Sequence, residues 1–342
     1  MLRRLLRMPN LVPRLRGDDV HGQRTTNVLA ERTVKTSSPR RPGPKFAALT
    51  SSLLFALTAH AGEPTQGFRF QIVSADDSAI TRRIAEDLYK RLVPTFAVFR
   101  TELAQRRRML YVAIGPAALR QVAARRCDCV VISAFTSSQV VRDIVGRLAP
   151  ARQAAITAVY AEPAPADQLR LAALLYRRPV RVAALLGSET AFLKPLLAAD
   201  KVAVLEATGG QDAIGDDGGI NLLLNRIAQT DVLLALPDAA IYNTENFRNI
   251  LLSTYRHKQG VIGFSADMVK AGALGTTYSE VEDINAQVAE IAAAYVAGGA
   301  LPAPQFPRYF RSIVNEGVAR SLDLTVTDAA RHFAHPVPAP RP

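Results

Sequence analysis

The sequence contains no tryptophan, and only two cysteines and five histidines among its 342 residues. It also lacks the G-x-S-x-G, G-x-x-x-x-G-K-[ST] and H-E-x-x-H segments, which mark serine hydrolases, P-loop nucleotide enzymes and zinc proteases. After residue 61, no apolar run reaches the roughly 20 residues that a membrane-spanning helix needs. These absences favour a soluble binding protein over an enzyme, and we expect neither a cofactor nor a metal ion.

Residues 45–61, KFAALTSSLLFALTAHA, are the most informative segment that is present. A lysine precedes a short apolar run, and the run ends at Ala59-His60-Ala61. A basic start, an apolar stretch too short to cross a bilayer and an A-x-A site are typical of a cleavable signal peptide. We therefore expect cleavage after Ala61 and a mature protein in the periplasm. The leader is unusually long, so a different translation start, near Val34, stays open.

The positive charge of the chain is concentrated in this leader. Residues 1–61 hold 11 of the 42 Lys and Arg but 3 of the 30 Asp and Glu, so they carry +8 of the net +12. The remaining +4 is spread over about 280 residues, which is far from the concentrated basic surface of a nucleic-acid-binding protein. We expect no nucleic-acid partner.

The two cysteines, Cys127 and Cys129, are separated by one residue. Such close neighbours rarely reach the geometry of a disulfide, so we expect two small core residues. A redox pair is the alternative, and the sequence leaves their oxidation state open. His332 and His335 lie three residues apart near the C-terminus, where we expect a solvated tail rather than a metal site.

Eight apolar segments of strand length follow the leader and alternate with segments of helical periodicity. Their apolar runs are continuous, as in VVISA, VAALLG and VLLALP, which is typical of parallel strands buried on both faces. This rhythm predicts an α/β fold with parallel sheets. The segments are 68–74, 110–115, 129–134, 155–161, 181–187, 201–207, 231–236 and 261–265.

Capping residues mark where several of the intervening helices begin. Ser188 is suited to cap one helix, and Asn243 or Thr244 another. Ser279 and Glu282 have the spacing of a capping box. The segment Glu162-Pro163-Ala164-Pro165 divides the strands into two groups of four, so we expect two lobes. The proline-rich residues 326–342 are expected to form a disordered tail.

Small polar residues follow the strands at the ends where α/β proteins bind ligands. Helix capping and ligand binding both use these residue types, so both interpretations stay open for each position. Together they suggest a site for a small polar ligand between two lobes. The candidate ligand-binding residues are Ser74, Asp76, Ser133, Phe135, Thr136, Ser188, Asp238, Tyr242 and Asn243.

Several longer segments resemble a known family. They are Ile114-Gly-Pro-Ala-Ala-Leu, the stretch from Asp231 (DVLLALPD) through VIGFS and KAGAL, and the ending VNEGVARSLDL. Together they resemble the substrate-binding proteins of ABC transporters in the TrpX-like group, over roughly residues 67–325. The resemblance implies the type I periplasmic binding fold: two Rossmann-like lobes joined by three crossovers and a hinge.

The resemblance also implies the lobe boundaries and a mechanism. The first lobe would comprise residues 67–160 and 268–298, and the second 165–266 and 304–325. The lobes would close on a solute, and the closed, monomeric protein would dock on the membrane permease of an ABC importer. It places Ser74, Ser133, Thr136, Asp238 and Asn243 in the pocket. A sensory or accessory binding protein for a membrane kinase or outer-membrane receptor is the main alternative, followed by an α/β enzyme such as a sugar transferase.

Overall fold

The fold is described from a computed structural model, which defines residues 69–98, 109–125, 127–148, 155–207 and 217–339. The expected signal peptide lies outside these residues. Within them, none of the helices combines the length and apolar character that crossing a membrane requires.

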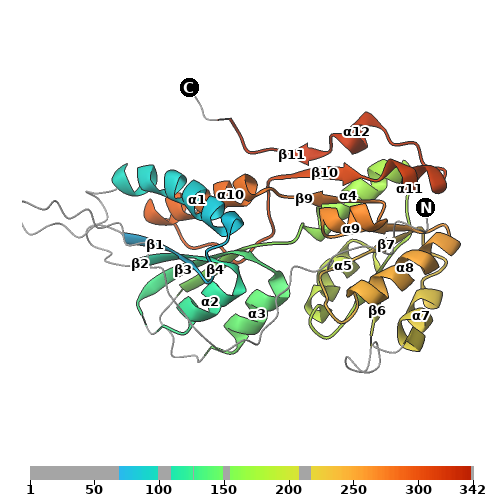
Figure 1. Cartoon of the computed structure of the whole chain (residues 1–342), viewed down its shortest axis with the longest axis horizontal. Helices are drawn as coiled ribbons and strands as arrows, with labels where there is room; N and C mark the ends of the chain where they lie inside the picture. The colour runs from blue at the N-terminus through green and yellow to red at the C-terminus, as the bar shows by residue number, and fades with distance from the viewer. Residues whose placement is uncertain (1–68, 99–108, 126, 149–154, 208–216, 340–342) are drawn as a thin grey trace, which may run out of the picture.

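The first sheet contains four parallel strands in the order β1-β2-β3-β4 (Figure 1). Both faces are buried, as the continuous apolar runs predict. On one face, helices α1 and α10 pack on side chains such as Leu110 and Val112, and on the other, α2 and α3 pack on Ala113 and Val131. The strands are β1 (Arg69–Ser74), β2 (Met109–Ile114), β3 (Cys129–Thr136) and β4 (Ala155–Tyr160), and the helices are α1 (Ala79–Val98), α2 (Gly115–Ala123), α3 (Ser138–Gly146) and α10 (Val281–Val296).

The second sheet has seven strands in the order β11-β10-β9-β8-β7-β5-β6. Strands β5 to β9 are parallel. At one edge of the sheet, β10 pairs antiparallel with β9, and β11 pairs antiparallel with β10. The strands are β5 (Val182–Leu186), β6 (Ala203–Glu206), β7 (Val232–Leu234), β8 (Gly260–Ile262), β9 (Gly275–Tyr278), β10 (Phe310–Val314) and β11 (Ala334–His335).

Helices also cover both faces of the second sheet. One face is covered by α7 (Asp217–Arg226), α8 (Thr244–Arg256) and α9 (Ala266–Ala271), and the other by α4 (Pro165–Tyr176), η2 (Ala191–Leu193), α5 (Lys194–Ala199), α11 (Glu316–Ser321) and α12 (Asp328–Arg331). The predicted α/β architecture of two lobes with parallel sheets is confirmed.

The chain passes between the lobes from β4 to α4, from β9 to α10 and from α10 to β10. One boundary differs from the expected one. Residues 266–278 form α9 and β9, and Met268, Val269 and Ala273 are buried in the second lobe, so the return to the first lobe comes about ten residues after residue 268. The apolar residues of this segment fit either lobe, and only the packing assigns them.

Residues 326–339 pack on the second lobe, contrary to the expectation of a disordered tail over residues 326–342. Thr327 caps α12 by accepting a hydrogen bond from the Ala330 backbone, and Ala330 is fully buried. Phe333 packs on Phe310 with ring centroids 5.2 Å apart. The Nδ1 atom of His335 lies 2.8 Å from the Arg308 carbonyl oxygen. These contacts stabilise a segment whose proline content alone predicts disorder.

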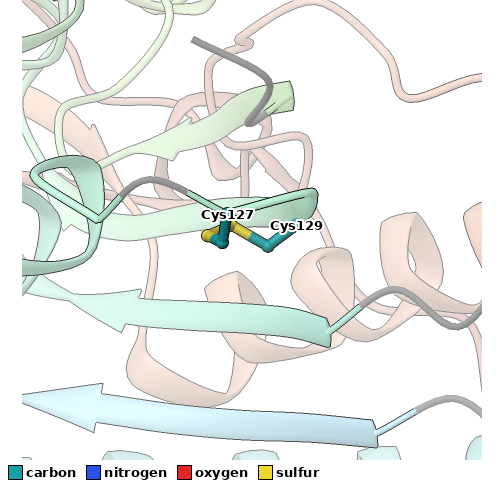
Figure 2. Close-up of a disulfide and its surroundings, with 2 residues drawn as sticks. All are labelled: Cys127 and Cys129. Atoms are coloured by element: carbon teal, nitrogen blue, oxygen red, sulfur yellow. A yellow bond between two sulfur atoms is a disulfide. The ribbon is translucent and has the colours of Figure 1, made fainter.

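The two cysteines form a disulfide, which was not expected from the sequence, and Cys129 is a buried core residue as expected (Figure 2). Their α-carbons are 5.2 Å apart, within the range that a disulfide can bridge. Cys129 begins β3, and Cys127 lies in the loop before it, so the bridge lies at the amino end of the first sheet. This is the end opposite the candidate ligand-binding residues of β3.

Two of the expected helix caps also differ from the structure. The capping box of α10 is formed by Glu280 and Asp283 rather than by Ser279 and Glu282. Ser279 instead donates a hydrogen bond to the Tyr309 carbonyl oxygen. Ser188 caps no helix and is exposed.

Candidate functional site

The end of β3 brings three of the candidate residues together. Ser133 and Thr136 are buried, and the Ser133 hydroxyl donates to the Thr136 hydroxyl at 3.3 Å. Between them, the register with β4 shifts and Phe135 adopts a φ of +58°. A bulky residue in this conformation is uncommon, and such strain and bulges cluster at functional sites. The bulge makes this strand end the most distinctive backbone feature of the first lobe.

At the end of β1, the candidate residue Asp76 makes hydrogen bonds to the start of helix α1. Asp76 Oδ1 accepts hydrogen bonds from the Ser78 backbone N–H at 3.0 Å and the Thr81 hydroxyl at 2.7 Å. The hydrogen bond from the Ser78 backbone lowers the pKa of Asp76, and the bond from Thr81 adds to this. Ser74 is exposed at the end of the strand. Asp76 therefore stabilises the start of α1, and Ser74 is the residue with a free surface here.

In the second lobe, Asp238 joins the loops that follow β5 and β7. Its Oδ2 accepts from the Thr190 hydroxyl at 2.8 Å and from the Gly187 N–H at 3.1 Å. Its Oδ1 accepts from the Ala240 N–H at 3.1 Å. Asp238 is 2% exposed, so its carboxylate holds these two loops together and has little surface of its own.

Gly187 explains how the Asp238 carboxylate can approach so closely. A Cβ at position 187 would lie 2.5 Å from Asp238 Oδ2, well inside van der Waals contact. Only glycine allows the backbone and the carboxylate to meet at this distance. This close contact between Gly187 and Asp238 was not predicted from the sequence.

Tyr242 and Asn243 lie on the turn that leads into α8. Tyr242 is buried, its ring packs edge-on to Phe264 with centroids 5.9 Å apart, and its hydroxyl has no partner among the described residues. Burial, followed by the charge of Asp238, raises the pKa of Tyr242. Asn243 accepts a hydrogen bond from the Asn246 N–H at 2.8 Å and so caps α8. The unpartnered hydroxyl makes Tyr242 the better ligand-binding candidate of the two.

Helix α3 of the first lobe contacts the second lobe through two side chains. Gln139 Nε2 donates to the Pro237 carbonyl oxygen at 2.7 Å. The Arg142 guanidinium carbon lies 4.4 Å from the centroid of the Phe192 ring. The first turns of α3 therefore meet the segments that follow β5 and β7, and the strand ends of both lobes converge at this interface.

Glu162 is a residue of this region that sequence reasoning missed. It follows β4 at the crossover to α4, is 6% exposed, and its Oε1 accepts from the Ser138 N–H at the start of α3 at 2.9 Å. Its Oε2 has no hydrogen-bond partner among the described residues. The strand-end argument could have found it, because Glu162 comes directly after the apolar run of β4.

The interface also gathers acidic groups from both lobes. Burial raises the pKa of Glu189, and the negative charges of Asp238 and Asp143 raise it further. Asp143 belongs to α3 and Glu189 to the loop after β5, so carboxylates of the two lobes influence each other. The interface holds charges of both signs, because the Arg142 guanidinium lies there as well.

No family model and no curated protein matches this sequence. Solved structures do match its fold. The ligand-free, open structure of a substrate-binding protein with adhesive properties from Clostridium difficile shares 14% identity with a TM-score of 0.50, covering 78% of this chain and 98% of that one. The fold is the type I periplasmic binding fold. A domain in complex with L-Trp from Streptococcus pneumoniae shares 16% identity with a TM-score of 0.45, covering 78% and 97%.

A separate pocket of about 510 Å³ lies at the opposite, amino end of strands β5, β7 and β8. Asp231 is at its centre, bound by Arg178 at 2.9 Å and by the Arg181 N–H at 2.8 Å. The hydrogen bond from Arg178 lowers the pKa of Asp231 to about 2. This pocket lies at the amino ends of the strands, whereas ligands of open α/β sheets bind beyond the carboxyl ends, so we assign the candidate site to the lobe interface.

Proposed function

We propose that this protein is a periplasmic substrate-binding protein that captures a small polar solute between its lobes and delivers it to an ABC importer. The observation that carries the proposal is the convergence of both sets of strand ends at α3, within a type I periplasmic binding fold. In open α/β sheets this is where ligands bind. The function needs no covalent chemistry, and we propose that the protein is not an enzyme.

The candidate solute-binding residues are those that the sequence suggested, but we now propose that only some of them contact the solute. Ser133, Phe135, Thr136 and Tyr242 lie at strand ends with a strained backbone or an unpartnered hydroxyl. Ser74 and Ser188 are exposed and free to approach a solute. Asp76, Asp238 and Asn243 make structural hydrogen bonds, so in this proposal they shape the site rather than grip the solute.

Two features support the periplasmic location. The segment that ends at Ala61 has the composition of a signal peptide. The Cys127–Cys129 disulfide also suits an oxidising compartment, because cytosolic reductants keep most thiols reduced. Sequencing the N-terminus of protein recovered from the periplasm tests this, with Gly62 as the expected first residue.

A thermal-shift screen of amino acids, short peptides, sugars and cofactors tests the binding function. A solute at 100 times its dissociation constant adds about 2.7 kcal/mol to the free energy of unfolding, which is a clear rise in the melting temperature. If every class of solute leaves the melting temperature unchanged, the solute-binding proposal fails. Asp238→Ala should destabilise the empty protein, and loss of binding in that variant alone would not place Asp238 in contact with the solute.

A binding protein of this fold could deliver its solute to a permease, or it could act as a sensor that reports the solute to a membrane kinase or receptor. The sensor alternative predicts binding without uptake. Deleting the gene should therefore abolish uptake of the solute that the screen identifies, if the importer proposal is correct. Normal uptake together with a lost signalling response would favour the sensor.

A further inference from the structure

Glu162 is buried, and one of its two carboxylate oxygens, Oε2, accepts no hydrogen bond from the described residues. The side chain is 6% exposed, and its carboxylate makes one hydrogen bond in the described structure, from the Ser138 N–H to Oε1. Oε2 has no partner, and neither has the Ser138 hydroxyl, although Ser138 is 1% exposed. Two buried polar groups without partners at one place are costly to leave unsatisfied, so this place is suited to accept a group from outside the protein.

The carboxylate also lacks a counter-charge. None of the described lysines, arginines or histidines forms an ion pair with Glu162. Burial raises the pKa of Glu162, although the hydroxyl and the backbone N–H of Ser138, which lie beside the carboxylate, oppose this shift. An isolated buried carboxylate is unfavourable in its charged form. A positively charged group from a ligand would offset the cost of the buried charge and would donate the hydrogen bond that Oε2 lacks.

The position of Glu162 connects it to the lobe interface. It binds the first residue of α3, and the next residue, Gln139, reaches the Pro237 carbonyl oxygen of the second lobe. Asp143, further along α3, and Glu189 of the second lobe influence each other across the same interface. Arg142 lies at the same interface, with its guanidinium over the Phe192 ring.

We propose that the solute carries a protonated amine, and that this amine binds the free oxygen of Glu162 and the hydroxyl of Ser138. Glu162 then determines the class of solute that the protein takes. The inference rests on the proposed solute-binding function and narrows it to cationic solutes. Because Glu162 holds the first turn of α3, the bound amine is also placed beside the contact that joins the two lobes.

Matched pairs of solutes test this proposal by thermal shift and calorimetry on the purified protein. The pairs are cadaverine with 1,5-pentanediol, glucosamine with glucose, and phenethylamine with phenethyl alcohol, and succinate serves as an anion. We expect the amine member of at least one pair to raise the melting temperature, and its neutral counterpart to bind at least ~30-fold more weakly. Glu162→Gln should weaken binding of the cationic member by a similar factor.

The Gln variant keeps the size of the side chain and an oxygen that can accept the Ser138 N–H, so the fold should survive. Glu245→Gln, at an exposed position in the first turn of α8, is the matched control and should bind as the wild type does. Unchanged affinity for a cationic solute in Glu162→Gln overturns the inference. Binding of only glucose, 1,5-pentanediol, phenethyl alcohol or succinate overturns it while the solute-binding function stands, and binding of nothing in this panel or the wider screen overturns both.

Discussion

The side-chain amide of Gln139 donates a hydrogen bond to the backbone carbonyl oxygen of Pro237, at 2.7 Å, and so joins the two lobes. Arg142, one turn further along α3, adds a second contact by lying over the Phe192 ring. Both contacts join protein groups alone, so they favour approach of the lobes whether or not a solute is bound. Ligand-driven closure would then add to an existing bias rather than create it.

This bias predicts the effect of removing both side chains. Gln139→Ala loses a hydrogen bond that contributes about 1 kcal/mol, and Arg142→Ala loses a cation–π contact of roughly 0.5–1 kcal/mol. The double variant should shift the solute-free protein toward open conformations by roughly 10- to 30-fold. Distances between spin labels on α2 and α8 would measure the shift. Arg147→Ala, which breaks an ion pair with Asp143 within α3, is the control and should leave these distances unchanged.

Gly187 and Asp238 should behave as a coupled pair. Gly187→Ala places a Cβ against the Asp238 carboxylate, and such overpacking costs about 1–3 kcal/mol of unfolding free energy. Asp238→Ala removes three hydrogen bonds to a charged group and should cost about 2–4 kcal/mol. In the Asp238→Ala background, Gly187→Ala should cost less than about 0.5 kcal/mol. Urea denaturation of the four proteins measures the coupling, and simple additivity of the two losses would contradict it.

Asp231 predicts a specific dependence of stability on pH. Its pKa is lowered from 3.8 to about 2, chiefly by the hydrogen bond from Arg178. A lowered pKa in the folded state means that the stabilisation is present above about pH 4 and is lost as the pH falls towards 2. Asp231→Asn should therefore be less stable at pH 6 and should lose less stability than the wild type between pH 4 and 2. Chemical denaturation at these pH values tests this, and equal losses in the two proteins would exclude Asp231 as a cause.

The architecture could be predicted because buried strands leave a simple signal. Runs such as VVISA and VAALLG are apolar on both faces, and this pattern arises only where helices cover a parallel sheet on both sides. The short strands β9 and β10 were not predicted, since GTTY and FRSIV mix polar and apolar residues. Their place in the sheet comes from pairing with neighbours that are distant in sequence.

The candidate site was less predictable because capping and ligand binding use the same side chains. Asp76 was a ligand-binding candidate, yet it stabilises the start of α1. Asn243 was expected either to bind ligand or to cap a helix, and the cap is confirmed. Glu162 was missed because its neighbours, Pro163 and Pro165, mark a linker. Its importance depends on burial against Ser138, which is 24 residues away.

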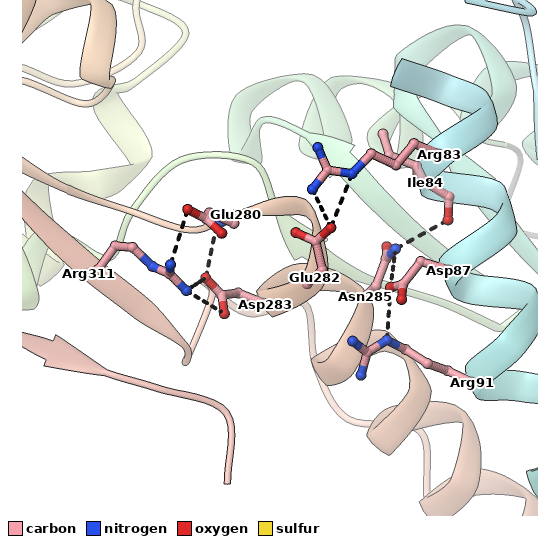
Figure 3. A network of polar contacts seen from close by, with 9 residues as sticks. All are labelled: Arg83, Ile84, Asp87, Arg91, Glu280, Glu282, Asp283, Asn285 and Arg311. Carbon is pink, nitrogen blue, oxygen red and sulfur yellow. Dashed lines mark hydrogen bonds and ion pairs between the residues drawn. The ribbon is translucent and has the colours of Figure 1, made fainter. Parts of the chain in front are cut away.

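The crossovers between the lobes carry a network of ion pairs that should control the stability of the hinge (Figure 3). Arg311 on β10 binds Asp283, which lies in the first turn of α10, at 3.1 Å, and Glu280 at the same distance. The Asp283 side chain is 5% exposed, and its Oδ2 also accepts from the Glu280 N–H. Arg311 therefore connects a strand of the second lobe to a helix of the first, at the point where the chain crosses.

Arg311→Met should lower the free energy of unfolding by about 1–3 kcal/mol, because it leaves the buried Asp283 carboxylate without its charged partner. Arg308→Met is the matched control: the Arg308–Glu290 pair spans 3.5 Å between side chains that are 49% and 42% exposed, and exposed pairs contribute at most about 1 kcal/mol. Urea denaturation compares the two. Adding Asp283→Asn to Arg311→Met should recover part of the lost stability, since the unpaired charge is then absent. If the second substitution instead adds a full further loss, Arg311 stabilises the hinge by packing and not by neutralising Asp283.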